Sequence, residues 1–255
     1  MLTSQVIFLK LKSGNPENIN GSHIHGLFFK EILKNYDTSL ADYLHQPNMP
    51  KAFSLSYIYQ DYGLYWFRIA SWMRDIADAV FSYFNSNFEI ILNNCVFELA
   101  KTSTDNKESY WANRININNF LDESKNTYKD IFRLEHFSPT SFKNGDSHIP
   151  LPMPEFIIKS IYKQMPLSMQ EYLQTEPELL IKFIQLKEHR IYSVYNRKNH
   201  GAITSFEGKT RWQIDKKASQ QEKEAIWTIF RFAFYSGIGV KTTQGMGMCR
   251  ASDSF

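Results

Sequence analysis

The chain has 255 residues and a net charge of +3, with 43% hydrophobic, 15% aromatic and 22% charged residues. This composition excludes a disordered polymer, because disordered chains are poor in aromatic and branched apolar residues, and the length allows two small domains. No run of about eighteen uncharged apolar residues occurs, which excludes a membrane-spanning helix. Because the N-terminus also lacks the features of a signal peptide, we expect a cytoplasmic globular protein with no membrane contact.

The first half of the chain predicts the element order β-α-β-β-α-β. Apolar residues at helical spacing predict a first helix that Ser22 could cap and a second helix at 73–84. This is the order of a ferredoxin-like split βαβ unit. Apolar runs and alternating patterns predict four strands, at 5–11, 52–60, 64–71 and 88–101.

The second half predicts the same order with a different sequence. Helices are expected after the Pro-rich segment 151–156, at 178–187 and after Ser219. The polar, Asn-rich stretch 103–126 is the expected boundary. We therefore predict an α+β fold of two tandem ferredoxin-like domains, residues 1–125 and 126–255. The strands of the second domain are expected at 130–137, 190–196, 202–214 and 246–250.

Positive charge is concentrated in the hairpin predicted for the second half. Eight basic and three acidic residues lie between 187 and 217, which gives this segment more positive charge than the whole chain. Such a stripe suits a polyanion, because each neutralised phosphate releases condensed counterions. A solvated hairpin edge protected by charge against aggregation would have the same composition. The candidate RNA-binding residues here are Arg197, Lys198, Lys209 and Arg211.

A glycine-rich loop follows the last predicted helix. Four of the 11 glycines lie within 237–247, together with a lysine and two threonines. Glycines let backbone N–H groups approach a phosphate, whereas a helix C-cap would explain only one or two of them. The order helix-loop-strand excludes a P-loop and a Rossmann fingerprint. The candidate anion-binding residues are Gly237, Gly239, Lys241, Thr242, Thr243, Gln244, Gly245 and Gly247.

Three segments in chain order carry a family resemblance. They are LADYLH at 40–45 with PKAFSLS at 50–56, FSPTSF at 137–142 with LPMP at 151–154, and SGIGVKTTQGMGM at 236–248. On the doubled βαββαβ pattern, they make the chain similar to the CRISPR-associated endoribonucleases that cut repeat transcripts into guide RNAs. This is the Cas-six family of the RAMP superfamily.

The resemblance implies a catalytic histidine at His45 and a neighbouring lysine at Lys51. It implies metal-independent cleavage, in which a ribose 2′-OH attacks the adjacent phosphate and leaves a 2′,3′-cyclic phosphate and a free 5′-OH. A histidine can transfer the protons, and a lysine can stabilise the charged phosphate. Some family members carry a tyrosine on the first helix. Its place falls here at Phe29, which cannot transfer a proton, or at Lys30, which could add charge.

The implied partner is CRISPR repeat RNA, with no cofactor and no metal. Scattered acidic residues agree with this, since a two-metal nuclease needs several converging carboxylates. Other CRISPR effector subunits and a second copy of the chain, as a homodimer, stay open as partners. The FSPTSF segment and the lysine that follows it add three RNA-binding candidates, Thr140, Ser141 and Lys143.

Two alternatives stay open at this point. A non-catalytic guide-RNA-binding subunit of the same superfamily would keep the glycine loop but would have no use for His45 and Lys51. His25 is a reserve candidate for the catalytic histidine. His23 and His25 form an HxH pair, but residues two apart on a helix point about 200° apart, so the pair is not expected to hold a metal.

Overall fold

The structure is a computed structural model that describes residues 1–46, 51–198 and 201–252. It divides into two compact units. The first unit contains Met1–Asn116 and Thr243–Gly245, and the second contains Ile117–Thr242 and Met246–Phe255. Helix α5 (Ile117–Asn126), which the predicted division assigned to the first domain, belongs to the second unit.

The first unit is built around strand β1 (Leu2–Ser13), which pairs antiparallel with β4 (Leu64–Ser71) and β6 (Cys95–Ser103). The strand order is β2-β4-β1-β6-β5, so β1 lies at the centre of the sheet. The smaller strands are β2 (Phe53–Leu55), β3 (Tyr59–Asp61), β5 (Glu89–Leu92) and β7 (Asn113–Ile115).

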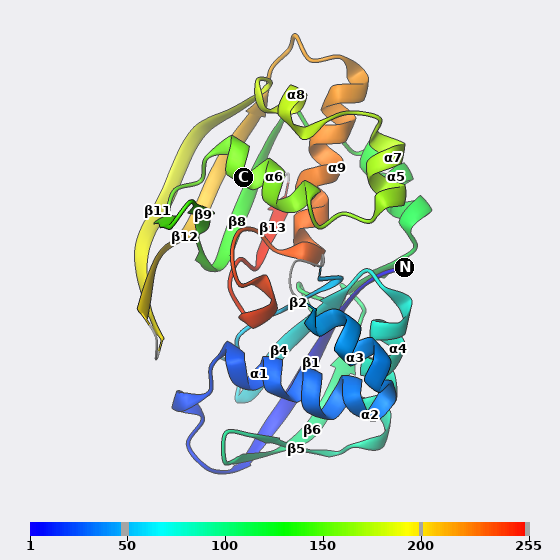
Figure 1. Cartoon of the computed structure of the whole chain (residues 1–255), viewed down its shortest axis with the longest axis vertical. Coiled ribbons are helices and arrows are strands. Elements are labelled where there is room, and N and C mark those ends of the chain that lie inside the picture. The colour runs from blue at the N-terminus through cyan, green and yellow to red at the C-terminus, as the bar shows by residue number, and fades with distance from the viewer. Residues whose placement is uncertain (47–50, 199–200, 253–255) are drawn as a thin grey trace. The chain divides into compact units, whose positions relative to one another are not determined.

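The helices of the first unit cover one face of this sheet (Figure 1). Their apolar residues share one core with Ile7, Leu9 and Phe67 of the sheet, all of which are fully buried. The first helical segment begins after Asn20, whose side chain accepts from the Ser22 amide, so the prediction that Ser22 caps the helix is wrong. The helical segments are α1 (Gly21–Leu27), a π-helical turn (Phe28–Leu33), α2 (Lys34–Tyr36), α3 (Thr38–His45) and α4 (Arg74–Ser86).

The single strand predicted at 88–101 is a hairpin of β5 and β6 instead. Asn93 and Asn94 connect the two strands, with positive φ angles of 47° and 63°. Asparagine tolerates this left-handed conformation better than most residues, and two such residues in succession are typical of a tight hairpin turn. The Asn-Asn pair is therefore a sequence signal for this turn, although the apolar residues on both sides of it suggested one continuous strand.

The second unit has the strand order β11-β12-β8-β13. Helix α9 (Gln220–Ser236) packs on one face of this sheet, where the Phe230 ring contacts those of Phe132 and Trp212. The remaining strands and helices are β8 (Ile131–Thr140), β9 (Phe142–Asn144), β10 (Ser147–Ile149), α6 (Pro154–Tyr162), α7 (Leu167–Leu173), α8 (Pro177–Ile181), β11 (Ile184–Lys198), β12 (Gly201–Ile214) and β13 (Cys249–Ser252).

Both units have the ferredoxin-like connectivity. In the first unit, β1 lies between β4 and β6, and β2 lies beyond β4. In the second unit, β8 lies between β12 and β13, and β11 lies beyond β12. The predicted fold class is therefore confirmed. The helix predicted at 178–187 is shorter, because α8 ends at Ile181 and the chain enters β11 at Ile184. None of the helices in the described part of the chain is long and apolar enough to cross a membrane.

Candidate active site

His45 is the last residue of helix α3 in the first unit. Asp37 is the N-cap of this helix, and its carboxylate accepts from the amides of Ser39 (2.8 Å) and Leu40 (3.2 Å). Leu40 and Leu44 are buried in the core and fix the helix on the sheet. His45 itself is exposed. A buried helix face thus holds an exposed imidazole at a defined position, as a proton-transfer group requires.

A second histidine lies beside His45. The ring centroids of His25 and His45 are 6.4 Å apart, and the ring of Phe29 lies 4.6 Å from His25 and 4.8 Å from His45. His25 is half-buried on α1, and Phe29 is buried one turn later, in the π-helical segment. Single π-helical turns inside a helix are frequent at functional sites. The three rings form a cluster in which both imidazoles can carry protons.

Phe29 occupies one of the two places at which the resemblance put the family's tyrosine. Its ring also packs against Phe28 (5.4 Å) and Phe53 (5.7 Å), so it is anchored in the core. Lys30, the other candidate, is exposed on the same segment. A proton-carrying group of this helix that does lie beside His45 is His25, one turn before Phe29.

His23 has a structural role at the start of α1. Its Nδ1 accepts a hydrogen bond from the Asn20 amide at 3.1 Å, which completes a capping box. His23 thus helps to begin the helix, while His25 lies against the Phe29 ring. The two rings of the HxH pair thus have different partners.

Lys51 lies at the C-terminal end of α3. Its Nζ donates to the carbonyl oxygens of Leu44 and Gln46, both at 2.6 Å. These carbonyls flank His45, and a cation is favourable at a helix C-terminus. Burial lowers the pKa of the Lys51 ammonium. Lys51 therefore fixes the backbone on both sides of His45 and places a positive charge next to it.

The four glycines of the 237–247 loop are explained by the packing of the loop itself. All four have positive φ angles. A Cβ on Gly239 would lie 2.2 Å from the Ser141 carbonyl oxygen, and a Cβ on Gly247 would lie 2.0 Å from that of Ile238. These contacts are far too short for any side chain. The glycine content therefore does not by itself indicate an anion site. The helix C-cap accounts for Gly237, and close packing accounts for the glycines that the C-cap leaves unexplained.

Most backbone amides of the loop are also used within the protein. Those of Ile238, Val240 and Gly247 donate to the carbonyls of Gly247, Ser141 and Pro139, and the Gly239 amide donates to the Ser160 hydroxyl. Only part of the loop is exposed to solvent. Lys241 is exposed at the start of a single 3-10 turn, Thr242–Gln244, in which Thr242 is buried and Thr243 and Gln244 are half-buried.

Gly245, Thr140 and Ser141 are also packed against other residues of the protein. A Cβ on Gly245 would lie 2.5 Å from the Tyr57 ring, and Gly245 forms a β-bridge with Ser56. Thr140 and Ser141 are fully buried, and the Thr140 hydroxyl donates to the Ser138 carbonyl. Thr140 is the last residue of strand β8, which extends beyond the strand predicted at 130–137. Lys143, on β9, is exposed.

The cations of the predicted stripe lie on the β11–β12 hairpin. Lys209 and Arg211 are on β12, with side chains 60% and 36% exposed. Arg197 and Lys198 lie in β11 by their backbone, and their side chains lie outside the described part of the structure. The hairpin therefore presents part of the predicted stripe on one sheet face.

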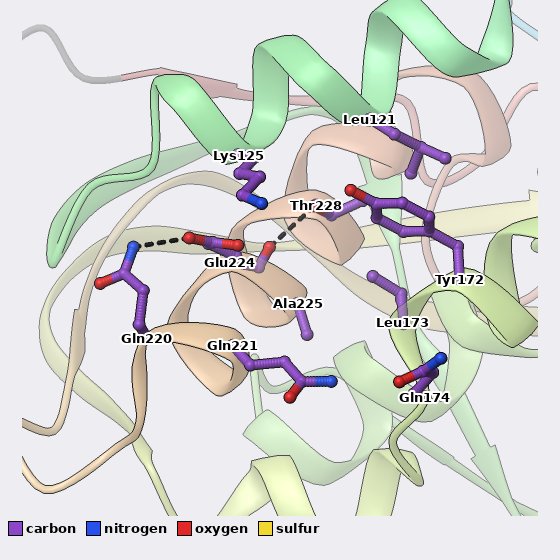
Figure 2. Close-up of a pocket in the computed structure, with 10 residues that line it drawn as sticks. All are labelled: Leu121, Lys125, Tyr172, Leu173, Gln174, Gln220, Gln221, Glu224, Ala225 and Thr228. Atoms are coloured by element: carbon purple, nitrogen blue, oxygen red, sulfur yellow. Dashed lines mark hydrogen bonds between the residues drawn. The ribbon is translucent and has the colours of Figure 1, made fainter.

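A polar cavity of about 510 Å³ lies among the helices of the second unit (Figure 2). Its wall comes from α5, α7 and α9, and Lys125 is the basic side chain among its lining residues. The Glu224 carboxylate accepts from the Gln220 amide at 2.6 Å. One lysine near a carboxylate is a poor match for a polyanion, so we do not assign RNA to this cavity. Across the described ranges, no three His, Cys, Asp or Glu side chains gather as metal ligands.

From the sequence, His25 is only a reserve candidate, and the structure places its ring beside that of His45. Its neighbour in the HxH pair drew attention to metal binding, whereas its partner in the fold is His45, 20 positions later. The available signal was the spacing on the first helix: His25 lies one turn from Phe29, the place of the family's proton-carrying residue.

Comparisons with known proteins identify the family of the chain. The family described as CRISPR-associated endoribonuclease Cas6 matches residues 134–249, and the CRISPR Cas6 N-terminal domain matches residues 1–70. Together these matches cover well over half of the chain. A CRISPR-associated endoribonuclease Cas6 from Streptococcus thermophilus is 24% identical over 255 residues, which are 95% of this chain and 96% of the relative.

Solved structures show the same fold. A Cas6 product complex has a TM-score of 0.79 at 20% identity, with 99% of both chains covered. Cas6 from Thermus thermophilus has a TM-score of 0.71 at 20% identity and covers 99% of this chain and 98% of its own. These likenesses extend over both ferredoxin-like units.

Proposed function

Because the chain belongs to the CRISPR-associated endoribonuclease Cas6 family, it is an endoribonuclease that acts on CRISPR repeat RNA, and we propose that His25 and His45 carry its chemistry. The two rings supply the base and the acid for attack of a ribose 2′-OH on the adjacent phosphate. The products are a 2′,3′-cyclic phosphate and a 5′-OH. The observation that carries this proposal is the 6.4 Å separation of the two ring centroids.

The separation suits two proton transfers at one phosphodiester. The attacking 2′-oxygen and the leaving 5′-oxygen lie on opposite sides of the same phosphorus, so each needs its own proton-transfer group. One histidine takes the proton from the 2′-OH, and the other protonates the leaving oxygen. Alignment of the 2′-oxygen with the phosphorus supplies much of the remaining barrier reduction.

Lys51 has two roles in this proposal. It positions His45 through the Leu44 and Gln46 carbonyls, and its charge stabilises the phosphate as negative charge develops. The exposed Lys30, on the segment that carries Phe29, adds charge to the same site. Both histidines and both lysines belong to the first unit, so the four side chains proposed for catalysis come from one chain.

RNA is held by exposed cations rather than by the glycines. Lys143 and Lys241 are exposed, and Lys209 and Arg211 lie on the sheet of the second unit. Arg197 and Lys198 extend the same hairpin. In this proposal the packed glycines keep the loop in one conformation, in which Lys241 is exposed and Thr243 and Gln244 follow it. The protein is proposed to act in the cytoplasm on repeat transcripts.

The test is cleavage of a repeat RNA in which the single ribose 5′ of the cut phosphate is 2′-deoxyribose. We expect this strand to bind and not to be cut, while the all-ribose strand is cut in excess EDTA. The upstream product should carry a cyclic phosphate. Cleavage of the deoxy strand, or loss of cleavage in EDTA that Mg²⁺ restores, would show a hydrolytic metal-dependent mechanism instead.

A further inference from the structure

Like charges face one another on the outer sheet face of the second unit. Arg211 of β12 lies directly opposite Arg133 of β8, and Lys209 of β12 lies directly opposite Arg190 of β11. The alternate β12 residues, Thr210 and Trp212, are buried on the other face. Like charges in direct cross-strand pairs destabilise a sheet. Each β12 cation also faces a carboxylate on its other neighbouring strand, Lys209 facing Glu135 at 3.4 Å and Arg211 facing Glu188 at 3.9 Å. These six side chains are four cations and two carboxylates, and a binding role accounts for the surplus of positive charge better than a lysine-protected edge does.

These side chains enclose a small cavity of about 210 Å³. It is smaller than the ~300–1,000 Å³ of pockets that enclose drug-sized ligands. Four of its lining residues are cations, so the cavity suits one small anionic group. The lining residues are Arg133, Glu188, Arg190, Lys209, Thr210 and Arg211.

Glu188 is the one carboxylate among these lining residues. Its Oε1 lies 3.4 Å from the Arg190 Nε, and its Oε2 lies 3.9 Å from the Arg211 Nη1. The two oxygens of one anionic group are thus shared between two guanidinium groups. A phosphodiester offers two charged oxygens in a similar arrangement, and arginine is well suited to bind them.

We propose that this cavity binds one phosphate of the RNA backbone and that the Glu188 carboxylate occupies the phosphate position until RNA displaces it. The inference rests on the proposed RNA-binding function and names a subsite for it. The Glu188 side chain is 44% exposed and that of Arg190 is 86% exposed, so both ion pairs are weak and easily exchanged. Glu188 is then an internal competitor that lowers the affinity for RNA.

The first test is Glu188→Gln, with affinity measured for the non-cleavable 2′-deoxy repeat strand described above. We expect ~2–5-fold tighter binding, because an exposed ion-pair competitor is lost. Glu178→Gln is the matched control. Glu178 of α8 pairs with Lys159 at 3.1 Å, is similarly exposed, and its replacement changes the net charge equally. Equal gains in both variants, or no gain in Glu188→Gln, would overturn the proposal.

The second test removes the cations. Arg190→Gln and Arg211→Gln should each weaken binding and reduce the slope of log affinity against log salt by ~0.7–0.9, the value for one phosphate contact. Thermal denaturation of both variants checks that the sheet is intact. Wild-type affinity and slope in two folded variants would exclude a phosphate at this cavity.

A strand made entirely of DNA separates this inference from the function on which it rests. A site that reads only phosphate predicts the same Glu188→Gln gain on DNA and RNA of equal length. A gain confined to RNA would mean that the cavity reads the ribose, and the phosphate assignment would be wrong. If the wild-type protein neither binds nor cuts repeat RNA, the proposed function fails, whereas wild-type cleavage with unaltered variants refutes the subsite alone.

Discussion

The imidazole rings of His25 and His45 lie with their centroids 6.4 Å apart, although one comes from the first helix and the other from the end of α3. Phe29 contacts both rings and is itself buried. The three centroid distances describe a triangle, so Phe29 packs against both imidazoles and limits their movement. The geometry thus holds the two proton-transfer groups close together on the first unit.

Replacement of His45 by alanine should abolish cleavage while RNA binding is largely kept. General acid–base catalysis contributes ~10²–10⁴-fold, so the single-turnover rate should fall by that range. His45 is exposed at a helix end, and its loss leaves the buried Leu40 and Leu44 in place. An unchanged rate in a folded His45→Ala variant would remove His45 from the chemistry.

Lys51→Met should reduce cleavage more than binding and should lower the melting temperature. The substitution removes both hydrogen bonds to the end of α3 as well as the charge beside His45. Lys51→Arg keeps the charge without the geometry of the ammonium group, and we expect it to restore part of the rate. Wild-type cleavage by Lys51→Met would show that neither role matters.

Gly247→Ala should destabilise the protein, whereas Gly26→Ala should stabilise it slightly. At Gly247 a Cβ would lie 2.0 Å from a carbonyl oxygen and φ is +73°, so strain of at least ~1–3 kcal/mol is expected. At Gly26, in α1, a Cβ meets nothing within 4 Å, and alanine gains ~0.5–1 kcal/mol in a helix. Chemical denaturation measures both, and equal stabilities would contradict the packing account of the loop.

His136 should make the unfolding free energy depend on pH. It is fully buried on β8 with Nε2 3.1 Å from the Thr210 hydroxyl, and burial lowers its pKa to about 3 from 6.5. The unfolded state therefore binds a proton first as pH falls. The contribution of the neutral, buried His136 to the free energy of unfolding is fully present above pH 6.5. This contribution is lost as the pH falls towards 3, by up to ~1.4 kcal/mol per pH unit.

His136→Gln removes that proton and should flatten the pH dependence in this interval. Denaturant titrations at several pH values give the slope for both proteins. The difference between wild type and variant should be constant above pH 6.5 and should shrink or change sign below it. A difference that stays constant throughout would show that His136 does not titrate between the two states.

The fold could be predicted because its signals are local. Helix α9 begins after Ser219, as predicted, and the strand pattern of both halves gave the doubled topology. The β5–β6 hairpin was missed because both of its strands are apolar and Asn93-Asn94 is a weak break in that pattern. Local periodicity therefore identified most elements and misplaced several boundaries.

The site was harder to predict because its contacts are not local. The Lys51 contacts with the α3 carbonyls depend on where the chain returns after the helix, and the pairing of His25 with His45 depends on packing through Phe29. The glycines of the loop were read as open backbone, whereas Gly239 and Gly247 are closed by Ser141 and Ile238. Composition reveals a glycine-rich loop but not what fills the space beside each glycine.

The central claim is that His25 and His45 act as an acid–base pair, and the single-turnover cleavage rate of His25→Ala as a function of pH tests it most directly. The wild type should show a bell-shaped profile, and His25→Ala should lose one limb of it together with ~10²-fold or more in rate. His23→Gln, which keeps a capping-box residue at the same helix end, is the matched control and should retain the bell. A folded His25→Ala variant with the rate and profile of the wild type would contradict the account.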